Sequence, residues 1–142
     1  MMKKGTKKEN KAAGSIDAAA VTFRRRWTVI IEAGLKGLKS DLAHLDEVTS
    51  KLGFVRWNWE YYRATYDLKL EDKASKENYY LRLDARAVEG KLESPHAILS
   101  IGDAYIGRAT FPHGIDYESP IPDHVLKTAN QKLAELKKRL SE

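Results

Sequence analysis

Apolar residues repeat along this chain with two different periods, and the period separates helices from strands. In two stretches they recur at intervals of three and four, which places them on one face of an amphipathic helix. We expect one helix over residues 40–52, with Ser40 or Asp41 as its N-cap, and a second over residues 123–140, with Asp123 as its N-cap.

Outside these helices, apolar residues form a short run or alternate with polar ones, as in β-strands. The expected strands are residues 27–31, 54–61, 64–70, 79–89, 97–101 and 104–111. The polar run 71–78 is read as a loop, and Gly102–Asp103 as a hinge between the last two strands. Consecutive strands with short connections pair antiparallel, and helices at both ends of the run pack on one face. We therefore predict an α+β two-layer sandwich: a mostly antiparallel sheet of about five to six strands covered on one face by two helices.

Composition changes this picture mainly through the position of the charges. The chain has 142 residues and a net charge of +5. Residues 1–26 carry eight lysines and arginines against two acidic residues, a net charge of +6, which leaves −1 for residues 27–142. We expect residues 1–26 to be a basic disordered arm and residues 27–142 to be a single domain. Because the domain itself is not basic, we do not expect it to bind nucleic acid.

The start of the chain leaves an alternative open. Both methionines are at positions 1 and 2. A start at a non-ATG codon for Val21, Val29 or Leu35 would make the basic arm a mis-called segment.

Targeting and redox signals point to the cytoplasm. The candidate apolar run Trp27–Ile31 stops at Glu32, which is too short for a signal peptide or a membrane span. The chain has no cysteine, so disulfides and thiolate sites are excluded, as fits a reducing compartment. We predict a cytoplasmic protein that is not embedded in a membrane.

Several short blocks, in order and at compatible spacing, resemble the YugN-like family of small uncharacterised proteins of bacilli and their relatives. The blocks are Trp57-Asn58-Trp59-Glu60, Thr65-Tyr66-Asp67, Tyr79-Tyr80-Leu81-Arg82-Leu83, Ala87-Val88-Glu89-Gly90 and Phe111-Pro112-His113-Gly114-Ile115-Asp116-Tyr117. The resemblance runs from about Gly34 to the C-terminus. It implies a compact α+β domain in the cytoplasm of a Gram-positive bacterium, and it supplies no catalytic residues.

The residues that carry acid–base chemistry suggest one candidate catalytic constellation. No phosphate loop, dinucleotide fingerprint, nucleophile elbow or HExxH motif is present. His113, held between a proline and a glycine, has Asp116 nearby, and Glu89 and His96 meet it if their strands are neighbours. His96 and His113 are then the metal-ligand candidates. In the alternative reading His113 caps a turn, and we expect neither a metal nor a cofactor.

Two further groups suggest ligand binding. Trp57 and Trp59 share one face of a predicted strand, where they stack on a ligand or else cover the core and a subunit interface. Arg82 and Arg86 flank Asp84 on the outward face of residues 79–89, where they clamp an anion or else form cross-strand ion pairs.

Together these patterns favour a non-catalytic binding or accessory module that self-associates, with a homodimer as the expected assembly. Its other partner is a protein or a small molecule that the sequence does not identify. The alternative is a small, metal-dependent enzyme that uses His113 with Asp116 or Glu89; it requires these groups to converge in a concave site.

Overall fold

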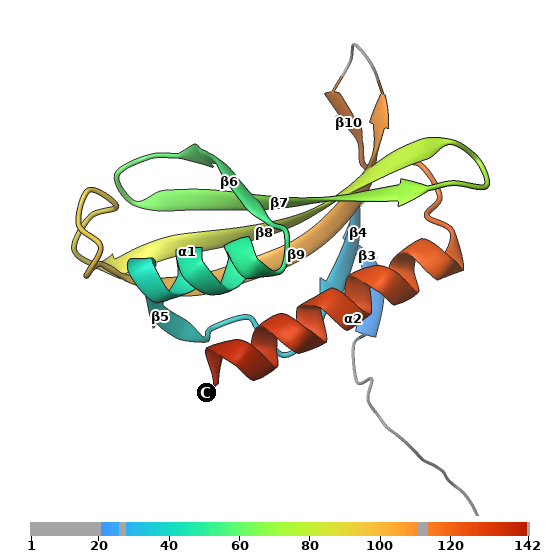
Figure 1. Cartoon of the computed structure of the whole chain (residues 1–142). Coiled ribbons are helices and arrows are strands. Elements are labelled where there is room, and N and C mark those ends of the chain that lie inside the picture. Colours follow the sequence, from blue (N-terminus) through green and yellow to red (C-terminus); the bar gives the residue numbers. More distant parts are fainter. Residues whose placement is uncertain (1–20, 26–27, 111–113, 142) are drawn as a thin grey trace, which may run out of the picture.

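The computed structural model describes residues 21–25, 28–110 and 114–141 (Figure 1). Its elements are, in chain order, β3 (Val21–Arg25), β4 (Thr28–Glu32), β5 (Lys39–Asp41), α1 (Leu42–Lys51), β6 (Val55–Trp59), β7 (Arg63–Asp72), β8 (Glu77–Glu89), β9 (Ile98–Thr110), β10 (Gly114–Asp116) and α2 (Asp123–Leu140). The predicted α+β class and both predicted helices are confirmed.

The described strands form one eight-stranded antiparallel sheet in the order β3-β4-β9-β8-β7-β6, with β5 and β10 also paired to β9. It exceeds the expected five to six strands because β5 and β10, three residues each, are too short to show a periodic pattern, and because β3 lies in the segment assigned to the basic arm. Strand β9 organises the sheet. One of its edges pairs with β8, and the other pairs successively with β5, β4 and β10.

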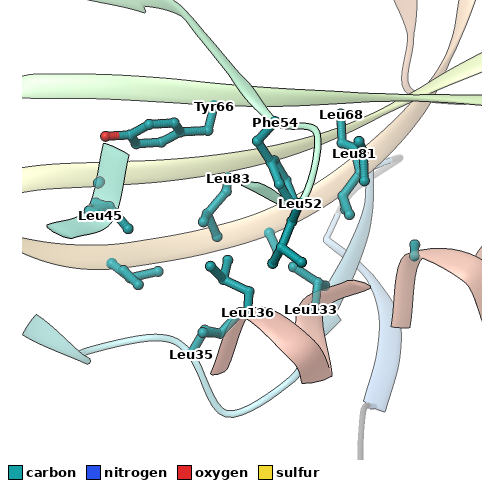
Figure 2. Packing of buried hydrophobic residues seen from close by; sticks show 14 of the residues in the cluster. Leu35, Leu45, Leu52, Phe54, Tyr66, Leu68, Leu81, Leu83, Leu133 and Leu136 are labelled. Atoms are coloured by element: carbon teal, nitrogen blue, oxygen red, sulfur yellow. The ribbon is translucent and has the colours of Figure 1, made fainter. Parts of the chain in front are cut away.

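The hydrophobic core lies between the sheet and the two helices, which pack on the same face (Figures 1 and 2). Alternate residues of the central strands point to this face, among them Tyr66, Leu81 and Leu83. Leu45 of α1 and Leu133 of α2 pack against them. Each fully buried leucine stabilises the fold by about 1.5–3 kcal/mol, so this layer accounts for the position of both helices.

Two contacts hold α1 in place. The carboxylate Oδ1 of Asp41 accepts a hydrogen bond from the His44 backbone N–H at 2.8 Å, which makes Asp41 the N-cap as predicted. The Tyr66 hydroxyl, from β7, donates to Oδ1 of Asp46 in α1 at 2.7 Å. Burial raises the pKa of Tyr66, and this hydrogen bond to Asp46 raises it further.

The predicted N-cap of α2 is wrong. The helix begins at Asp123, and the capping position is occupied by the extended Pro122, which has no side-chain cap. Asp123 instead lies in the first turn, where its carboxylate interacts favourably with the helix dipole.

Three strand boundaries differ from the sequence reading. The predicted strands 97–101 and 104–111 are one strand, β9, and the expected hinge at Gly102–Asp103 is a β-bulge that shifts the register against Leu83 and Ala85. The bulge reverses the alternation, so that Ile101 and Ala104 are both buried and the sequence pattern is interrupted between them.

The predicted loop 71–78 is a four-residue turn between β7 and β8, because pairing continues through Asp72 and Glu77 despite their polarity. Residues 21–25, assigned to the basic arm, form β3 and pair with β4. Their arginines hide the strand from a hydrophobicity pattern. Residues 1–20 lie outside the described part of the chain.

Candidate functional site

The sheet face turned away from α1 and α2 contains an open hollow of about 600 Å³. It lies over β7, β8 and β9 and is closed at one side by the segment that precedes β5. The charged and hydroxyl-bearing residues in its lining are Lys36, Glu60, Arg63, Thr65, Asp84, Arg86, Ser100 and Tyr105. We call this the open-face hollow.

Small residues on β9 create the hollow. Ser100 pairs with Arg86, and Gly102 lies at the bulge, where a Cβ would be 3.5 Å from the Asp84 backbone oxygen. Large side chains at these positions would fill the space. The neighbouring segment is fixed to β9 because the Gly37 N–H donates to the Ile101 carbonyl at 2.8 Å. The hollow is thus formed by regular backbone pairing.

Two arginines face one another at one end of this hollow. Arg63 of β7 is the direct cross-strand partner of Arg86 of β8, and both side chains are exposed. Neither guanidinium forms an ion pair with a residue in the described ranges. Like charges directly opposite one another destabilise a sheet, so this pair has an unfavourable interaction that the fold itself does not offset.

Asp84 lies next to this pair, two residues from Arg86 along β8. Its Oδ1 accepts a hydrogen bond from the Tyr105 hydroxyl at 3.1 Å. Burial raises the pKa of the Asp84 carboxyl, and the neighbouring Asp103 charge adds to the shift, while hydrogen bonds from Tyr105 and Thr65 oppose it. Burial, together with the charge of Asp84, raises the pKa of Tyr105.

Arg82 has a structural role on the same face. It binds Asp67 through two hydrogen bonds, Nε to Oδ1 at 2.8 Å and Nη2 to Oδ2 at 3.1 Å. Its Nη1 donates to the Tyr117 hydroxyl at 2.9 Å, and the Tyr117 ring lies 5.6 Å from that of Tyr105. Of the two arginines named from the sequence, Arg82 thus contacts Asp67 and Tyr117, and Arg86 lies opposite Arg63.

The catalytic constellation predicted from the sequence is not brought together in the described residues. His113 lies outside them. Asp116 holds the turn after β10, where its Oδ2 accepts from the Ser119 hydroxyl at 2.6 Å. This bond, with the Glu118 backbone N–H, lowers the pKa of Asp116. Asp116 is thereby engaged in local structure.

Glu89 lies far from Asp116. Asp116 pairs with Arg108, and Arg108 pairs with Tyr79 near the start of β8, ten residues before Glu89. At roughly 3.3 Å per residue, the two positions are on the order of 30 Å apart. No cluster of three histidine, aspartate or glutamate residues that could hold a metal ion occurs in the described ranges.

The remaining candidates from the sequence, His96, Trp57 and Trp59, are not among the described residues that line the hollow. His96 is exposed in the turn between β8 and β9, where its backbone N–H donates to the Ser94 hydroxyl at 3.2 Å. Trp57 and Trp59 belong to β6 by their backbone, but their side chains lie outside what the structure describes. Among the described side chains, Tyr61 and Tyr62 in the turn before β7 are exposed aromatic residues.

Comparison with known proteins identifies the family of this chain. The model of the YugN-like family matches residues 30–140, from β4 to the end of α2. The chain belongs to the YugN-like family. The match includes every residue named in the open-face hollow and leaves out β3.

Two YugN-like relatives come from Bacillus subtilis (strain 168). The uncharacterized protein YlbA is 34% identical over 87 residues, which are 61% of this chain and 71% of YlbA. The uncharacterized protein YugN is 31% identical over 88 residues, so the match spans 61% of this chain and only 63% of that relative.

The crystal structure of YugN from Geobacillus kaustophilus HTA426 has the same architecture. It superimposes with a TM-score of 0.67 at 34% identity, over 78% of this chain and 92% of that one. Among the described residues of the present YugN-like chain, neither helix combines the length and the apolarity that a bilayer crossing requires.

Proposed function

We propose that this YugN-like protein is a non-catalytic binding module that holds a small ligand in the open-face hollow. The proposal depends on one observation: Arg63 and Arg86 oppose each other at the hollow without an acidic partner among the described residues. Sites that break a local rule of sheet stability are typically functional, because the unfavourable contact is relieved when a ligand binds.

The shape of the site supports the same proposal. Ligand sites are concave, with volumes of about 300–1,000 Å³, and have a few convergent polar groups. The hollow has about 600 Å³ and collects hydroxyls from Thr65, Ser100 and Tyr105 beside its charged groups. Because it lies on paired strands, its side chains are held by a rigid backbone.

The enzymatic alternative is less well supported. It would use His113 with Asp116 or Glu89, and the two carboxylates lie near opposite ends of β8. Asp84, one of the two carboxylates in the lining of the hollow, is held by hydrogen bonds from neighbouring side chains. These contacts suit a positioned binding group.

The test is a thermal-shift screen of small metabolites against the full chain and a Ser100→Phe variant, with Ser50→Phe as the control. The phenyl ring introduced by Ser100→Phe would occupy the hollow, whereas Ser50 is exposed on α1. A ligand at about 100 times its Kd stabilises by about 2.7 kcal/mol. We expect a compound that raises the Tm of the wild type and of the Ser50→Phe variant and leaves that of Ser100→Phe unchanged. If no compound is lost selectively in Ser100→Phe, the proposal is wrong.

Self-association is a second proposal, favoured by the edge of the sheet. Strand β6 is outermost, so one of its edges has no strand partner within the described residues, and its first residue, Val55, is 62% exposed. Edge strands of this kind pair readily with another chain, and lysines on the edge prevent it. Light scattering should show a dimer that Val55→Lys converts to monomer. A wild-type chain that stays monomeric at the highest concentration that light scattering allows would contradict this proposal.

A further inference from the structure

The charges in the open-face hollow are arranged by sign. Arg63 and Arg86 lie opposite each other on β7 and β8, and Asp84 precedes Arg86 by two residues along β8, on the same face. Cβ atoms of directly opposed residues are about 5 Å apart. Positions two residues apart along a strand are separated by about 7 Å. A cationic end and an anionic end therefore lie within reach of one small molecule.

The cationic end has the geometry of an oxyanion site. Guanidinium groups present parallel N–H donors that match a carboxylate or phosphate, and two from adjacent strands enclose such a group from both sides. Lys36, also in the lining, is already engaged by Asp103 at 3.2 Å, so the free donors belong to the arginine pair. A bound oxyanion turns the repulsion between them into two attractions.

The anionic end has capacity for a cation. The Asp84 carboxylate is held by hydroxyl groups and has no ion pair with a lysine or arginine in the described part of the chain. Arg82, two residues away, is bound to Asp67 and Tyr117. An ionised carboxylate accepts about four hydrogen bonds, so Tyr105 and Thr65 leave positions that an ammonium group fills.

A ligand that carries only negative charge fits less well. It would gain from Arg63 and Arg86 but approach Asp84 and the acidic Glu60 at the rim. A ligand that carries only positive charge meets the converse problem at the arginines. A molecule with both charges satisfies each end of the hollow.

We propose that the open-face hollow recognises a small zwitterion, whose carboxylate or phosphate binds between Arg63 and Arg86 and whose ammonium group binds Asp84. This ligand class rests on the proposed function, because it takes the hollow to be the binding site. The hollow of about 600 Å³ admits molecules of amino-acid size with room for a side chain or an ester group.

The experiment is calorimetric titration of the full chain with matched compounds. β-Alanine and γ-aminobutyrate carry both charges, propionate and butyrate only the negative one, and propylamine and butylamine only the positive one. Phosphoethanolamine and inorganic phosphate form the same comparison for the other oxyanion. We expect at least one zwitterion to bind roughly tenfold more tightly than either of its halves, which corresponds to one added charge-assisted contact. The chemical series that shows the gain identifies the oxyanion as carboxylate or phosphate.

Substitutions then separate the two ends. Arg63→Gln and Arg86→Gln should each weaken the zwitterion by about tenfold or more, while Arg139→Gln, an exposed arginine paired with Glu135 on α2, should not. Asp84→Asn should weaken the zwitterion and strengthen the anion-only analogue. Loss of folding cannot produce these opposite changes, because it would weaken both.

Each other result has a definite meaning. If the anion alone binds as tightly as the zwitterion, or Asp84→Asn weakens both equally, the zwitterion proposal is wrong, although the hollow remains a ligand site. The same holds if none of these compounds binds but another compound is lost in Ser100→Phe. If no compound at all is lost in Ser100→Phe, the proposed function itself fails.

Discussion

His124, in the first turn of α2, hydrogen-bonds the buried carboxylate of Asp72 at the end of β7, with 2.9 Å between Nε2 and Oδ1. Asp72 is only 5% exposed, and its Oδ2 also accepts from the Ser75 hydroxyl at 2.8 Å. The contact joins the β7–β8 turn to the start of the helix that covers the core. A single carboxylate therefore connects a hairpin with a helix 52 residues away.

This contact makes stability depend on acid pH. The His124 hydrogen bond, followed by that of Ser75, lowers the pKa of Asp72 in the folded state. A lowered carboxyl pKa stabilises the fold above the unfolded-state pKa of about 3.9, and this stabilisation is lost as the pH falls through the folded-state pKa. We expect the Tm difference between wild type and Asp72→Asn to have its full size above about pH 5 and to narrow below about pH 4. A difference that stays constant down to about pH 2 would show that Asp72 does not contribute through its charge.

The Tyr66 hydroxyl should contribute measurably to stability. It is 1% exposed and donates to Asp46 across the interface between β7 and α1. We expect Tyr66→Phe to lower the free energy of unfolding by about 0.5–1.5 kcal/mol in urea titrations, the usual range for one hydrogen bond. Tyr62→Phe, at an exposed position, is the control and should change it by less than about 0.5 kcal/mol.

The arginine pair should cost stability in the absence of ligand. Replacing Arg63 or Arg86 by glutamine removes a like-charge contact, so each variant should be more stable than wild type by a few tenths of a kcal/mol at low salt. The gain should shrink at about 0.5 M NaCl, because these exposed charges are screened. Arg139→Gln, which breaks an ion pair with Glu135, should show no gain. Substitutions at Arg63 and Arg86 that destabilise the ligand-free protein would imply a structural role for the pair.

Strand β3 should stabilise the domain although it lies outside the family match. It forms five residue pairs with β4. Its Phe23 lies opposite Ile30, a buried residue on the sheet face turned away from the helices. A chain of residues 28–142 should be less stable than one of residues 21–142 by about 1–3 kcal/mol, from cross-strand pairs worth a few tenths each. Urea denaturation of the two chains provides the measurement. Equal midpoints would show that the strand adds nothing.

Local patterns predict the helices and the buried face well. Leu45 of α1 and Leu133 of α2 each belong to a series of apolar residues at helical spacing, and Leu81 and Leu83 of β8 are two residues apart, as on one face of a strand. They fail where an element is short or its pattern is interrupted. The bulge at Gly102 inverts the alternation within β9, and the three residues of β10 are fewer than two periods of a strand.

The open-face hollow depends on register, which periodicity does not reveal. Alternation on β8 correctly places Arg86 outward, but it cannot show which residue of β7 lies opposite. That residue is Arg63, because the four-residue turn between the strands pairs Asp72 with Glu77 and so fixes every later pair. Counting back from this turn identifies Arg63 once the polar run 71–78 is recognised as part of a hairpin. Ser100 escapes prediction for a related reason, since small residues leave no mark in a hydrophobicity pattern.

The central position of β9 has a consequence for the growing chain during synthesis. Strands β4 and β5 have their places beside β9, which begins only at Ile98. When a ribosome has released the chain as far as Glu89, the β6–β7–β8 meander is complete, but the earlier strands have no central neighbour. The N-terminal strands must wait for residues 98–110 before they join the sheet, and α2 covers the core last of all. A nascent chain stalled before Ile98 therefore exposes the apolar strand β4 to chaperones.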